Sequence, residues 1–213
     1  MSRLKLDITM SLDGYIAEPG VSREEGLGKG GEALHEWAYG LKSFDEMHGR
    51  SSDAEAGIDD EVVTEAASGF GAAIMGKRMF CAEDGPWGDE PFEGWWGDDP
   101  PFKAPVFVLT NYARDPLELG ETRFEFVTEG IESALDKARN AASGEDVQIS
   151  GGANVAQQYL AAGLLDEMQI HIAPILLGGG TRLFADGADF SRLKVTRVIE
   201  SPAVTHIRYE IKR

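Results

Sequence analysis

The segment Ile149-Ser150-Gly151-Gly152-Ala153-Asn154-Val155 carries the most specific local pattern in the chain. Val147 and Ile149 predict a short strand that runs into two glycines, and a helix is expected directly afterwards. Backbone amides at the start of a helix favour an anion such as a pyrophosphate, and glycines let a ligand lie against the chain. A tight strand-to-helix turn that binds no ligand is the alternative interpretation.

Alternating and helical patterns extend outward from this segment to both ends of the chain. Apolar residues at every second position predict a first strand from Leu4 to Met10. Further strands are expected at 72–75, 106–109, 124–127, 147–149, 167–173, 193–199 and 205–211, and helices at 34–47, 60–67, 131–142 and 154–162. This order predicts one α/β domain over residues 1–213. We expect a three-layer sandwich whose central sheet has about eight strands, mixed but mostly parallel, with a C-terminal antiparallel hairpin.

A long segment between two predicted strands, residues 83–103, is rich in Gly, Pro and Asp. It also holds Trp87, Trp95 and Trp96. Loops of this length inside a compact domain are usually functional or disordered. Because solvent-exposed tryptophans are unfavourable, the sequence predicts an ordered loop or a lid.

Composition limits the classes of partner. The 213 residues carry a formal net charge of −17, which disfavours nucleic acid and anionic membrane surfaces. No apolar run approaches the roughly 20 residues of a membrane-spanning helix, and the N-terminus shows no secretory pattern. Cys81 is the only cysteine, so no intrachain disulfide can form. These features predict a cytoplasmic protein.

Two cations follow the strand predicted at 72–75. That strand ends in Gly76, and Lys77 and Arg78 come next. Ligands of open α/β sheets bind at the carboxyl ends of strands, so this pair is a candidate phosphate contact. The alternative is that both cations pair with local acids. A P-loop is disfavoured, because Arg78 stands where that motif needs Ser or Thr.

The four histidines give no metal-site pattern: His35, His48, His171 and His206 lack ligand spacing, so no metal is expected. The sequence also lacks G-x-S-x-G, which leaves hydrolase chemistry little support. His171 lies on the strand face opposite Ile170 and Ile172. It is either a solvated or hydrogen-bonded histidine of the sheet, or a substrate contact in a cleft.

Several segments, taken in order, resemble one family. They are Asp7–Ala17, Met75–Phe80, Val106–Asn111, Ser150–Val155, Asp166–Pro174 and Leu177–Gly180. The set is similar to the dihydrofolate reductase-like superfamily, and more closely to the riboflavin biosynthesis reductase domain, which is the C-terminal domain of bifunctional deaminase-reductases. The deaminase signatures H-x-E and P-C-x-x-C are absent from the sequence.

The resemblance implies NADPH as cofactor and assigns residues to its parts. Thr9 and Ile16 would face the nicotinamide carboxamide. The candidates near the adenosine 2′-phosphate are Gly76, Lys77, Arg78, Thr110 and Asn111. The nicotinamide side and the pyrophosphate would be contacted by Ser150, Gly151, Gly152, Ala153, Asn154 and Val155. Trp37 and His171 are the substrate-binding candidates, and the family suggests a homodimer.

The chain departs from the family pattern at three places. Lys77 stands where the family has Arg and is a less bidentate phosphate partner, and Met79 replaces a Thr hydroxyl. The region of Glu36 and Trp37 does not present the carboxylate with which dihydrofolate reductases hold the pterin. Folate reduction is therefore disfavoured, and the loops at 18–33 and 83–103 suggest a different substrate entrance.

The sequence thus predicts an NADPH-dependent oxidoreductase that transfers a hydride to a small, heterocyclic or carbonyl-bearing substrate. Reduction of 5-amino-6-(5-phosphoribosylamino)uracil in the riboflavin pathway is the first alternative. A non-catalytic nucleotide-binding protein of the same fold is the second. For the proton, the candidates are a bound water or a group near Glu36 or His171.

Overall fold

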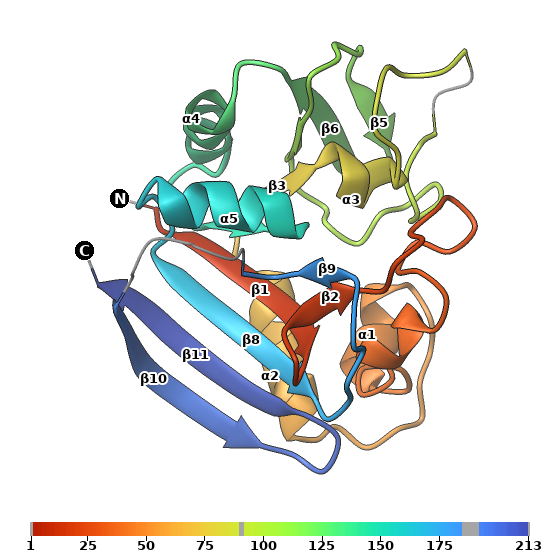
Figure 1. Cartoon of the computed structure of the whole chain (residues 1–213), viewed down its shortest axis with the longest axis vertical. Coiled ribbons are helices and arrows are strands. Elements are labelled where there is room, and N and C mark those ends of the chain that lie inside the picture. The colour runs from red at the N-terminus through yellow and green to blue at the C-terminus, as the bar shows by residue number, and fades with distance from the viewer. Residues whose placement is uncertain (1, 90–91, 185–191, 213) are drawn as a thin grey trace.

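The computed structural model describes residues 2–89, 92–184 and 192–212, and a nine-stranded sheet runs through them. In sheet order the strands are β10 (Arg192–Glu200), β11 (Thr205–Lys212), β8 (Glu167–Ala173), β1 (Leu4–Ser11), β7 (Val147–Ile149), β3 (Ala72–Gly76), β4 (Val106–Leu109), β6 (Thr122–Val127) and β5 (Leu117–Leu119) (Figure 1). All pairs from β8 across to β6 are parallel. The outer pairs are antiparallel. The predicted sheet class and its C-terminal hairpin are confirmed.

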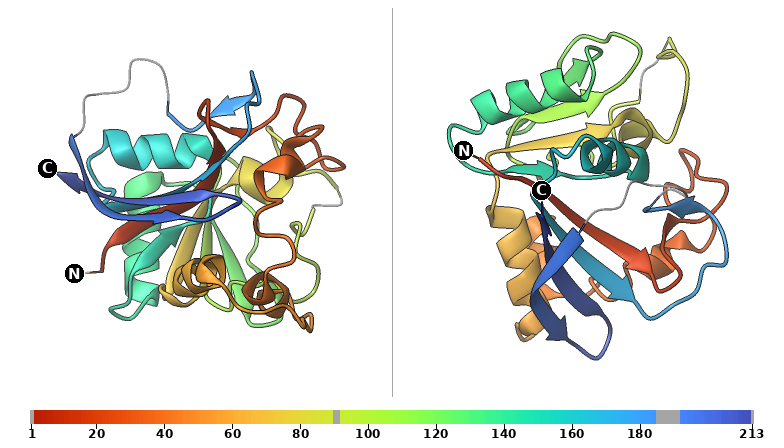
Figure 2. Two further views of the ribbon diagram at one scale, coloured as in Figure 1. Left: turned by 90° about the horizontal axis from the view of Figure 1, so that it is seen from below. Right: turned by 60° about the vertical axis from the view of Figure 1, so that its left-hand side comes forward.

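Helices lie on both faces of the sheet and make three layers (Figure 2). The first face is covered by α4 (Ile131–Ala141) and α5 (Ala153–Ala161), whose apolar side chains form one core with β1, β3, β7 and β8. The second face is covered by α2 (Ile58–Ser68) and by the Trp-rich segment 83–103. Successive side chains of a strand point to opposite faces of the sheet, so each face has its own apolar side chains for these covering elements to pack against.

The remaining elements of the described chain are short. These are η1 (Gly31–Leu34), α1 (Lys42–Met47) and α3 (Lys77–Cys81). A two-stranded sheet joins β2 (Tyr15–Ala17) to β9 (Thr181–Arg182). Sequence patterns missed α3, β2, β5 and β9, because elements of two to five residues show too little periodicity.

The prediction of one helix over residues 34–47 is wrong. The chain forms η1, then turns, and only then α1. Gly40 interrupts the helix with a φ of 86°, and Leu41 is extended before α1 begins. A glycine tolerates this left-handed conformation, which breaks the hydrogen-bond ladder. The three-to-four spacing of apolar residues here marks buried side chains such as Leu34 and Ala38 rather than one helix.

The Trp-rich segment is ordered in its described part, as predicted. The Trp96 ring stacks on Phe124 with centroids 6.0 Å apart, and the Trp87 ring packs edge-on against Phe126. Trp95 Nε1 donates a hydrogen bond to the carbonyl of Met79 at 2.8 Å. The tryptophans therefore fasten this segment to β6 and α3.

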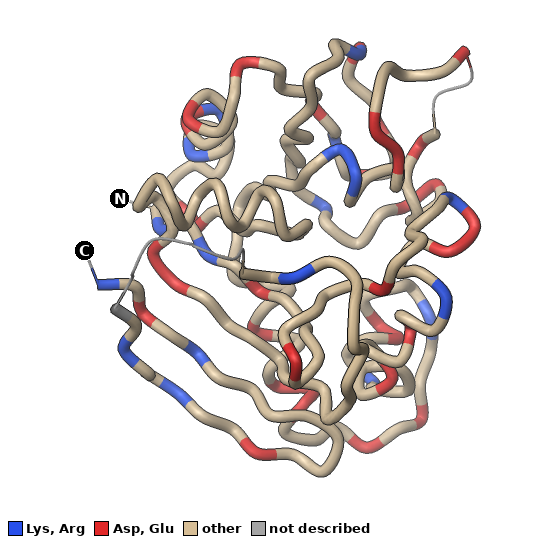
Figure 3. The backbone as a smooth tube through the Cα atoms, in the orientation of Figure 1, with Lys and Arg blue, Asp and Glu red and all other residues tan. Residues whose placement is uncertain are grey.

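The charges do not gather in one place. Figure 3 shows Asp and Glu spread over helices, loops and strands, with Lys and Arg among them. None of the helices in the described ranges combines the length and the apolar character that a membrane crossing requires.

Candidate functional site

A cavity of about 350 Å³ opens on the second face of the sheet. Its floor comes from β1, from β8 and from the turn after β7, and one wall comes from the second half of α2. Met79, Trp96 and Phe102 also line the cavity. The segment from η1 to the end of α1 closes it with Trp37 and Phe44, among others. Most of the lining is apolar, which is typical of a small-molecule site. The polar side chains that line it are those of Asp7, Thr9, His35, His48, Gln148, Ser150 and His171.

The turn between β7 and α5 is built for close contact. The peptide between Gly151 and Gly152 is cis, and Gly151 has a φ of 97°. A Cβ on Gly151 would lie 3.2 Å from Met79 Sδ, and one on Gly76 would lie 3.0 Å from Val155 Cγ2. The Gly76 amide also donates to the Gly151 carbonyl at 3.1 Å. The two glycine-bearing segments that the sequence singled out are therefore packed against each other.

The predicted cofactor and substrate residues divide into two groups in the structure. The residues that line the cavity are Thr9, Ile16, Trp37, Ser150, Gly151, Gly152 and His171. The others lie outside its lining: Gly76, Lys77, Arg78, Thr110, Asn111, Ala153, Asn154 and Val155. Ala153 and Val155 are buried at the start of α5, and Asn154 Oδ1 accepts a hydrogen bond from Gln158. Their roles toward a ligand remain predictions.

The two cations after β3 have different surroundings. Lys77 is buried, and its Nζ donates to the Glu83 carbonyl at 3.0 Å. The same Nζ lies 4.5 Å from the centroid of the Trp87 ring. Arg78 is exposed and makes a long 3.8 Å ion pair with Asp84. This placement does not support a phosphate contact for Lys77, because its ammonium group is already held inside the fold, and it leaves Arg78 as the exposed candidate.

Trp37 and His171 lie together at the cavity. Their ring centroids are 5.0 Å apart, and Trp37 Nε1 donates to Thr9 Oγ1 at 3.3 Å. Trp37 also packs edge-on against His206, with centroids 5.2 Å apart. The two predicted substrate residues are therefore neighbours, although they lie far apart in the sequence. Glu36, a predicted neighbour of the proton source, is exposed.

His171 is the middle of a hydrogen-bond chain that sequence reasoning missed. His171 Nε2 lies 2.9 Å from Asp7 Oδ1, and His171 Nδ1 lies 2.6 Å from His206 Nδ1. His206 Nε2 lies 2.8 Å from Asp59 Oδ1, on the first turn of α2. His171 is therefore hydrogen-bonded within the sheet and also lines the cavity, and its contact with a substrate stays a prediction.

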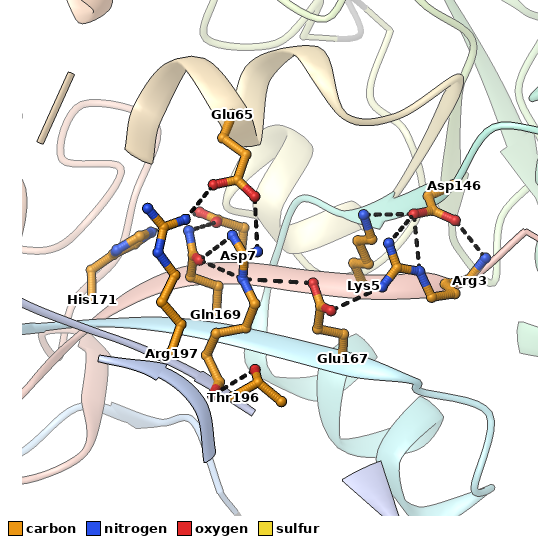
Figure 4. Close-up of polar contacts among 11 residues, drawn as sticks. Arg3, Lys5, Asp7, Glu65, Asp146, Glu167, Gln169, His171, Thr196 and Arg197 are labelled. Carbon is orange, nitrogen blue, oxygen red and sulfur yellow. Dashed lines mark hydrogen bonds and ion pairs between the residues drawn. The ribbon is translucent and has the colours of Figure 1, made fainter. Parts of the chain in front are cut away.

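Strand register explains how these groups meet. Thr9 pairs with His171 and His171 pairs with His206, so one row crosses β1, β8 and β11. The next row joins Asp7, Gln169 and Arg208. Gln169 Nε2 donates to Asp7 Oδ2 at 3.0 Å, as drawn in Figure 4. Arg208 in turn donates to Gln169 Oε1, which fixes the direction of the amide and holds the Asp7 carboxylate in place.

The pKa values of two histidines are shifted in this region. Burial lowers the pKa of His35 to about 4, and the nearby His171 adds to the effect. Burial also lowers the pKa of His206, against the raising effect of the hydrogen bond that its Nε2 makes to the Asp59 carboxylate. His35 Nδ1 is buried without a hydrogen-bond partner among the described residues. These imidazoles therefore favour their neutral forms.

Asp7 and His206 did carry a signal in the sequence. Each is a polar residue that alternates with apolar neighbours on a strand, which places it on a face that a helix then covers. Asp59 carried none, because its partner depends on how α2 crosses the sheet. No group of three or more His, Cys, Asp or Glu within the described ranges is arranged to hold a metal ion.

Comparisons with known proteins agree with this architecture. The Bacillus subtilis protein YyaP, described as uncharacterized, is 24% identical over 210 residues, which cover 95% of this chain and 92% of YyaP. A putative riboflavin biosynthesis protein from Shewanella sp. PV-4 has a similar structure, with a TM-score of 0.62, 22% identity and 99% of each chain covered. Dihydrofolate reductase from Enterococcus faecalis, solved with NADP(H), gives a TM-score of 0.54 at 12% identity, over 99% of this chain and 97% of that one.

At such low sequence identity, these solved structures show that this chain shares their fold. Membership of a family is shown by a family model instead. The model of the RibD C-terminal domain matches residues 3–207, which is nearly the whole chain. The resemblance inferred from the sequence is thereby confirmed, and this chain belongs to the RibD C-terminal domain family.

Proposed function

We propose that this protein is an NADPH-dependent reductase of a small, unphosphorylated, planar substrate. The observation that carries the proposal is the glycine turn after β7, which borders a 350 Å³ cavity beside Thr9 and His171. A family of reductases and a cavity with few polar groups both support this reading.

The cofactor side rests on residues that fit a dinucleotide. Gly152 lines the cavity and a Cβ placed on it would meet no atom within 4 Å, so a ligand can approach the backbone closely there. The nine-residue helix α5 begins at this turn and has no side-chain cap, so its first amides remain open to an anion. Arg78 is exposed at the carboxyl end of β3 and suits a 2′-phosphate. When bound, NADPH would supply a hydride.

The substrate side rests on charge. No lysine or arginine lines the cavity in the described part of the chain, whereas aromatic and apolar side chains do. A substrate phosphate in a largely apolar pocket needs a cation or several donors to replace its water. The cavity therefore favours a neutral planar molecule that stacks on Trp37 or Phe102. The riboflavin-pathway alternative, whose substrate carries a ribosyl phosphate, is less favoured on this ground.

A matched pair of substrates tests the proposal. NADPH oxidation is followed with 5-amino-6-(5-phosphoribosylamino)uracil and with the same compound lacking the phosphate, next to menadione and 4-nitrobenzaldehyde. We expect turnover of at least one unphosphorylated compound and little of the phosphorylated one. Faster turnover of the phosphorylated compound would establish the riboflavin-pathway reaction instead.

Cofactor binding is tested separately, by quenching of the four tryptophans on titration with NADPH and with NADH. Saturable binding that is tighter for NADPH supports the cofactor. Binding without turnover of any panel compound would establish the non-catalytic alternative. No binding of either nucleotide would refute both.

The proposed partner is a second copy of the chain. The edge strand β10 exposes Leu193, Val195 and Val198, each more than 40% accessible. Edge strands with apolar side chains pair readily with another chain. We expect a dimer in sedimentation experiments and a monomer after V195K/V198K, with L176K as the matched control.

Cys81 is buried and forms no disulfide, which suits the reducing cytoplasm that we propose as the location of this protein.

A further inference from the structure

Asp7 is the one acidic side chain that lines the cavity among the described residues, and no lysine or arginine of that part of the chain lies beside it in the lining. The side chain comes from β1 on the floor of the cavity and is 22% exposed. A carboxyl group among apolar and aromatic side chains is unfavourable unless its lone pairs meet water or a donor. The groups around Asp7 therefore decide what this cavity can bind.

Two protein donors hold the Asp7 carboxyl from the side of the sheet. His171 Nε2 lies 2.9 Å from Oδ1, and Gln169 Nε2 donates to Oδ2 at 3.0 Å (Figure 4). Arg208 fixes the Gln169 amide by donating to its Oε1, and Arg208 is itself held by Glu65 at 2.8 Å. The carboxyl group is thus fixed in position, with one contact on each oxygen, before any ligand enters.

Toward the cavity, Asp7 offers acceptor positions alone. Each carboxyl oxygen has two lone pairs, so each keeps one beyond its contact with the protein. The proton that the described geometry places next to Asp7 lies in its contact with His171. The Gln169 amide donates to the other oxygen, and the positive charge of Arg208 behind it favours a carboxylate. A ligand that meets Asp7 must therefore bring its own donor.

Hydroxyl groups lie next to this acceptor. β1 and β7 pair in parallel up to the residues that precede Asp7 and Ser150, so these two follow side by side on the cavity face. Thr9 lies two residues further along β1 and shares that face. Its Oγ1 accepts from Trp37 Nε1 at 3.3 Å, which leaves the hydroxyl proton to donate. The floor of the cavity thus places an acceptor beside two hydroxyl donors.

We propose that Asp7 is a substrate-binding residue, which selects planar heterocycles that carry an N–H beside a carbonyl, as a lactam does. The N–H donates to a free lone pair of Asp7, and the carbonyl accepts from the hydroxyl of Ser150 or Thr9. The rings of Trp96 and Phe102 line the same cavity and suit the flat faces of the heterocycle. This assignment rests on the proposed function and narrows its planar substrate to one chemical class.

Selection against analogues follows from the cost of an unpaired acceptor. A planar ligand without the N–H displaces water from Asp7 and returns no donor. Sites built to hydrogen-bond a substrate N–H or O–H reject the analogue that lacks it far more strongly than an apolar pocket rejects a change in size. A hydrogen bond to a charged group corresponds to a factor of about 10 to 100 in affinity.

Two probes of the same size and shape test the assignment without turnover. Calorimetric titration compares 2-quinolinone with coumarin, in which a ring oxygen replaces the N–H, in the absence and in the presence of saturating NADPH. We expect the wild type to bind 2-quinolinone at least about tenfold more tightly than coumarin. Equal affinity for the two, tighter binding of coumarin, or no binding of either at millimolar concentration overturns the assignment.

A pair of variants assigns the preference to Asp7. D7N exchanges one oxygen for an NH2 group, and the remaining oxygen is taken by His171 or Gln169, so the preference for 2-quinolinone should fall below about threefold. D146N removes a carboxylate of similar exposure, 18%, that pairs with Arg3 and Lys5 outside the cavity lining, and it should keep the preference.

The coumarin titration separates recognition from a merely structural role of Asp7. D7N should bind coumarin at least as tightly as the wild type does, because the group that coumarin leaves unpaired is gone. Weaker binding of both probes would show that Asp7 only supports the cavity, and an unchanged preference for 2-quinolinone would show that the acceptor lies elsewhere. Either result overturns the assignment.

Failure of the proposed function has a different signature. A wild type that prefers 2-quinolinone but oxidises NADPH with no compound of the panel refutes the reductase and supports the binding assignment. A wild type that reduces a panel compound yet binds the two probes equally refutes the assignment and leaves the reductase in place.

Discussion

Two halves of one sheet face are covered by opposite chemistry. One row of the register runs from Glu167 through Lys5 and Gln148 to Ala73, Val106 and Phe124, so it changes from polar to apolar at its middle. The apolar half over β3, β4 and β6 is covered by aromatic rings of the Trp-rich segment. The polar half over β1, β8 and β11 is covered by α2 through paired groups.

The two halves of the sheet face contribute differently to the stability of the fold and to its dependence on pH. Apolar packing stabilises in proportion to buried area and does not depend on pH. A buried polar network contributes little net stability and depends on each proton being in place. The cavity lies where the halves meet, since Asp7 and His171 come from one and Met79 and Trp96 from the other. The cavity thus has aromatic and apolar side chains of one half beside hydrogen-bonding groups of the other.

The largest effect is expected in the apolar half. Phe80 is fully buried and contacts the rings of Trp87, Trp96 and Phe124. F80A should lower the free energy of unfolding by about 3–5 kcal/mol, from the lost transfer energy and the cavity left behind. Urea denaturation measures it, with L176A at a largely exposed site as a control that changes it by about 0.5 kcal/mol or less. A loss below about 1 kcal/mol would contradict the role given to this half.

The next largest effect is a pH dependence of the free energy of unfolding, caused by a histidine in the cavity lining. His35 has a pKa of about 4 in the folded protein, against an ordinary value of 6.5. Between these values the unfolded chain binds the proton and the folded one does not, so stability is full above pH 6.5 and falls as the pH drops toward 4. We expect this histidine to account for a loss of about 2 kcal/mol, allowing for partial exposure.

Comparison of two proteins isolates that contribution. Unfolding free energies of the wild type and H35Q are measured near pH 7 and near pH 4.5, and H35Q should lose less on acidification. Carboxylates elsewhere contribute equally to both proteins and cancel in the difference. An equal loss in the two proteins would show that His35 takes up its proton in the folded state without cost.

A third test addresses the glycine turn between the halves. G151A places a Cβ at a φ of 97° and within 3.3 Å of Met79 Sδ and Cγ. We expect a loss of about 1–2 kcal/mol in stability and at least tenfold weaker NADPH binding by fluorescence. G88A, where a Cβ meets no atom within 4 Å, is the matched control and should leave both unchanged. Unchanged NADPH affinity in G151A would separate the turn from the cofactor.

The contrast between the halves also explains what the sequence could predict. Strands such as 106–109 and 167–173 were predicted with their observed bounds, because alternation and apolar runs are local signals. The glycine turn was found for the same reason. The hydrogen-bond chain from Asp7 through His171 and His206 to Asp59 was not, because His171 and His206 meet only through the pairing of β8 with β11. Likewise, nothing near Lys77 in the sequence shows that Trp87 will cover its ammonium group.

The smallest effect on stability is expected at Arg78, and it is measured beside Lys77 because the sequence could not tell these two cations apart. R78Q removes an exposed ion pair and should change stability by at most about 0.5 kcal/mol, yet weaken NADPH about tenfold while NADH binding stays constant. K77Q should do the reverse, because its buried ammonium group bonds a carbonyl and a ring: about 1–3 kcal/mol of stability is lost and the preference for NADPH over NADH is kept. The two titrations, run beside urea curves, measure both quantities on the same samples. If K77Q loses the preference for NADPH over NADH instead, the Lys77 side chain of the wild type must leave the Trp87 ring when the cofactor binds. The apolar half would then take part in cofactor recognition as well as in stability.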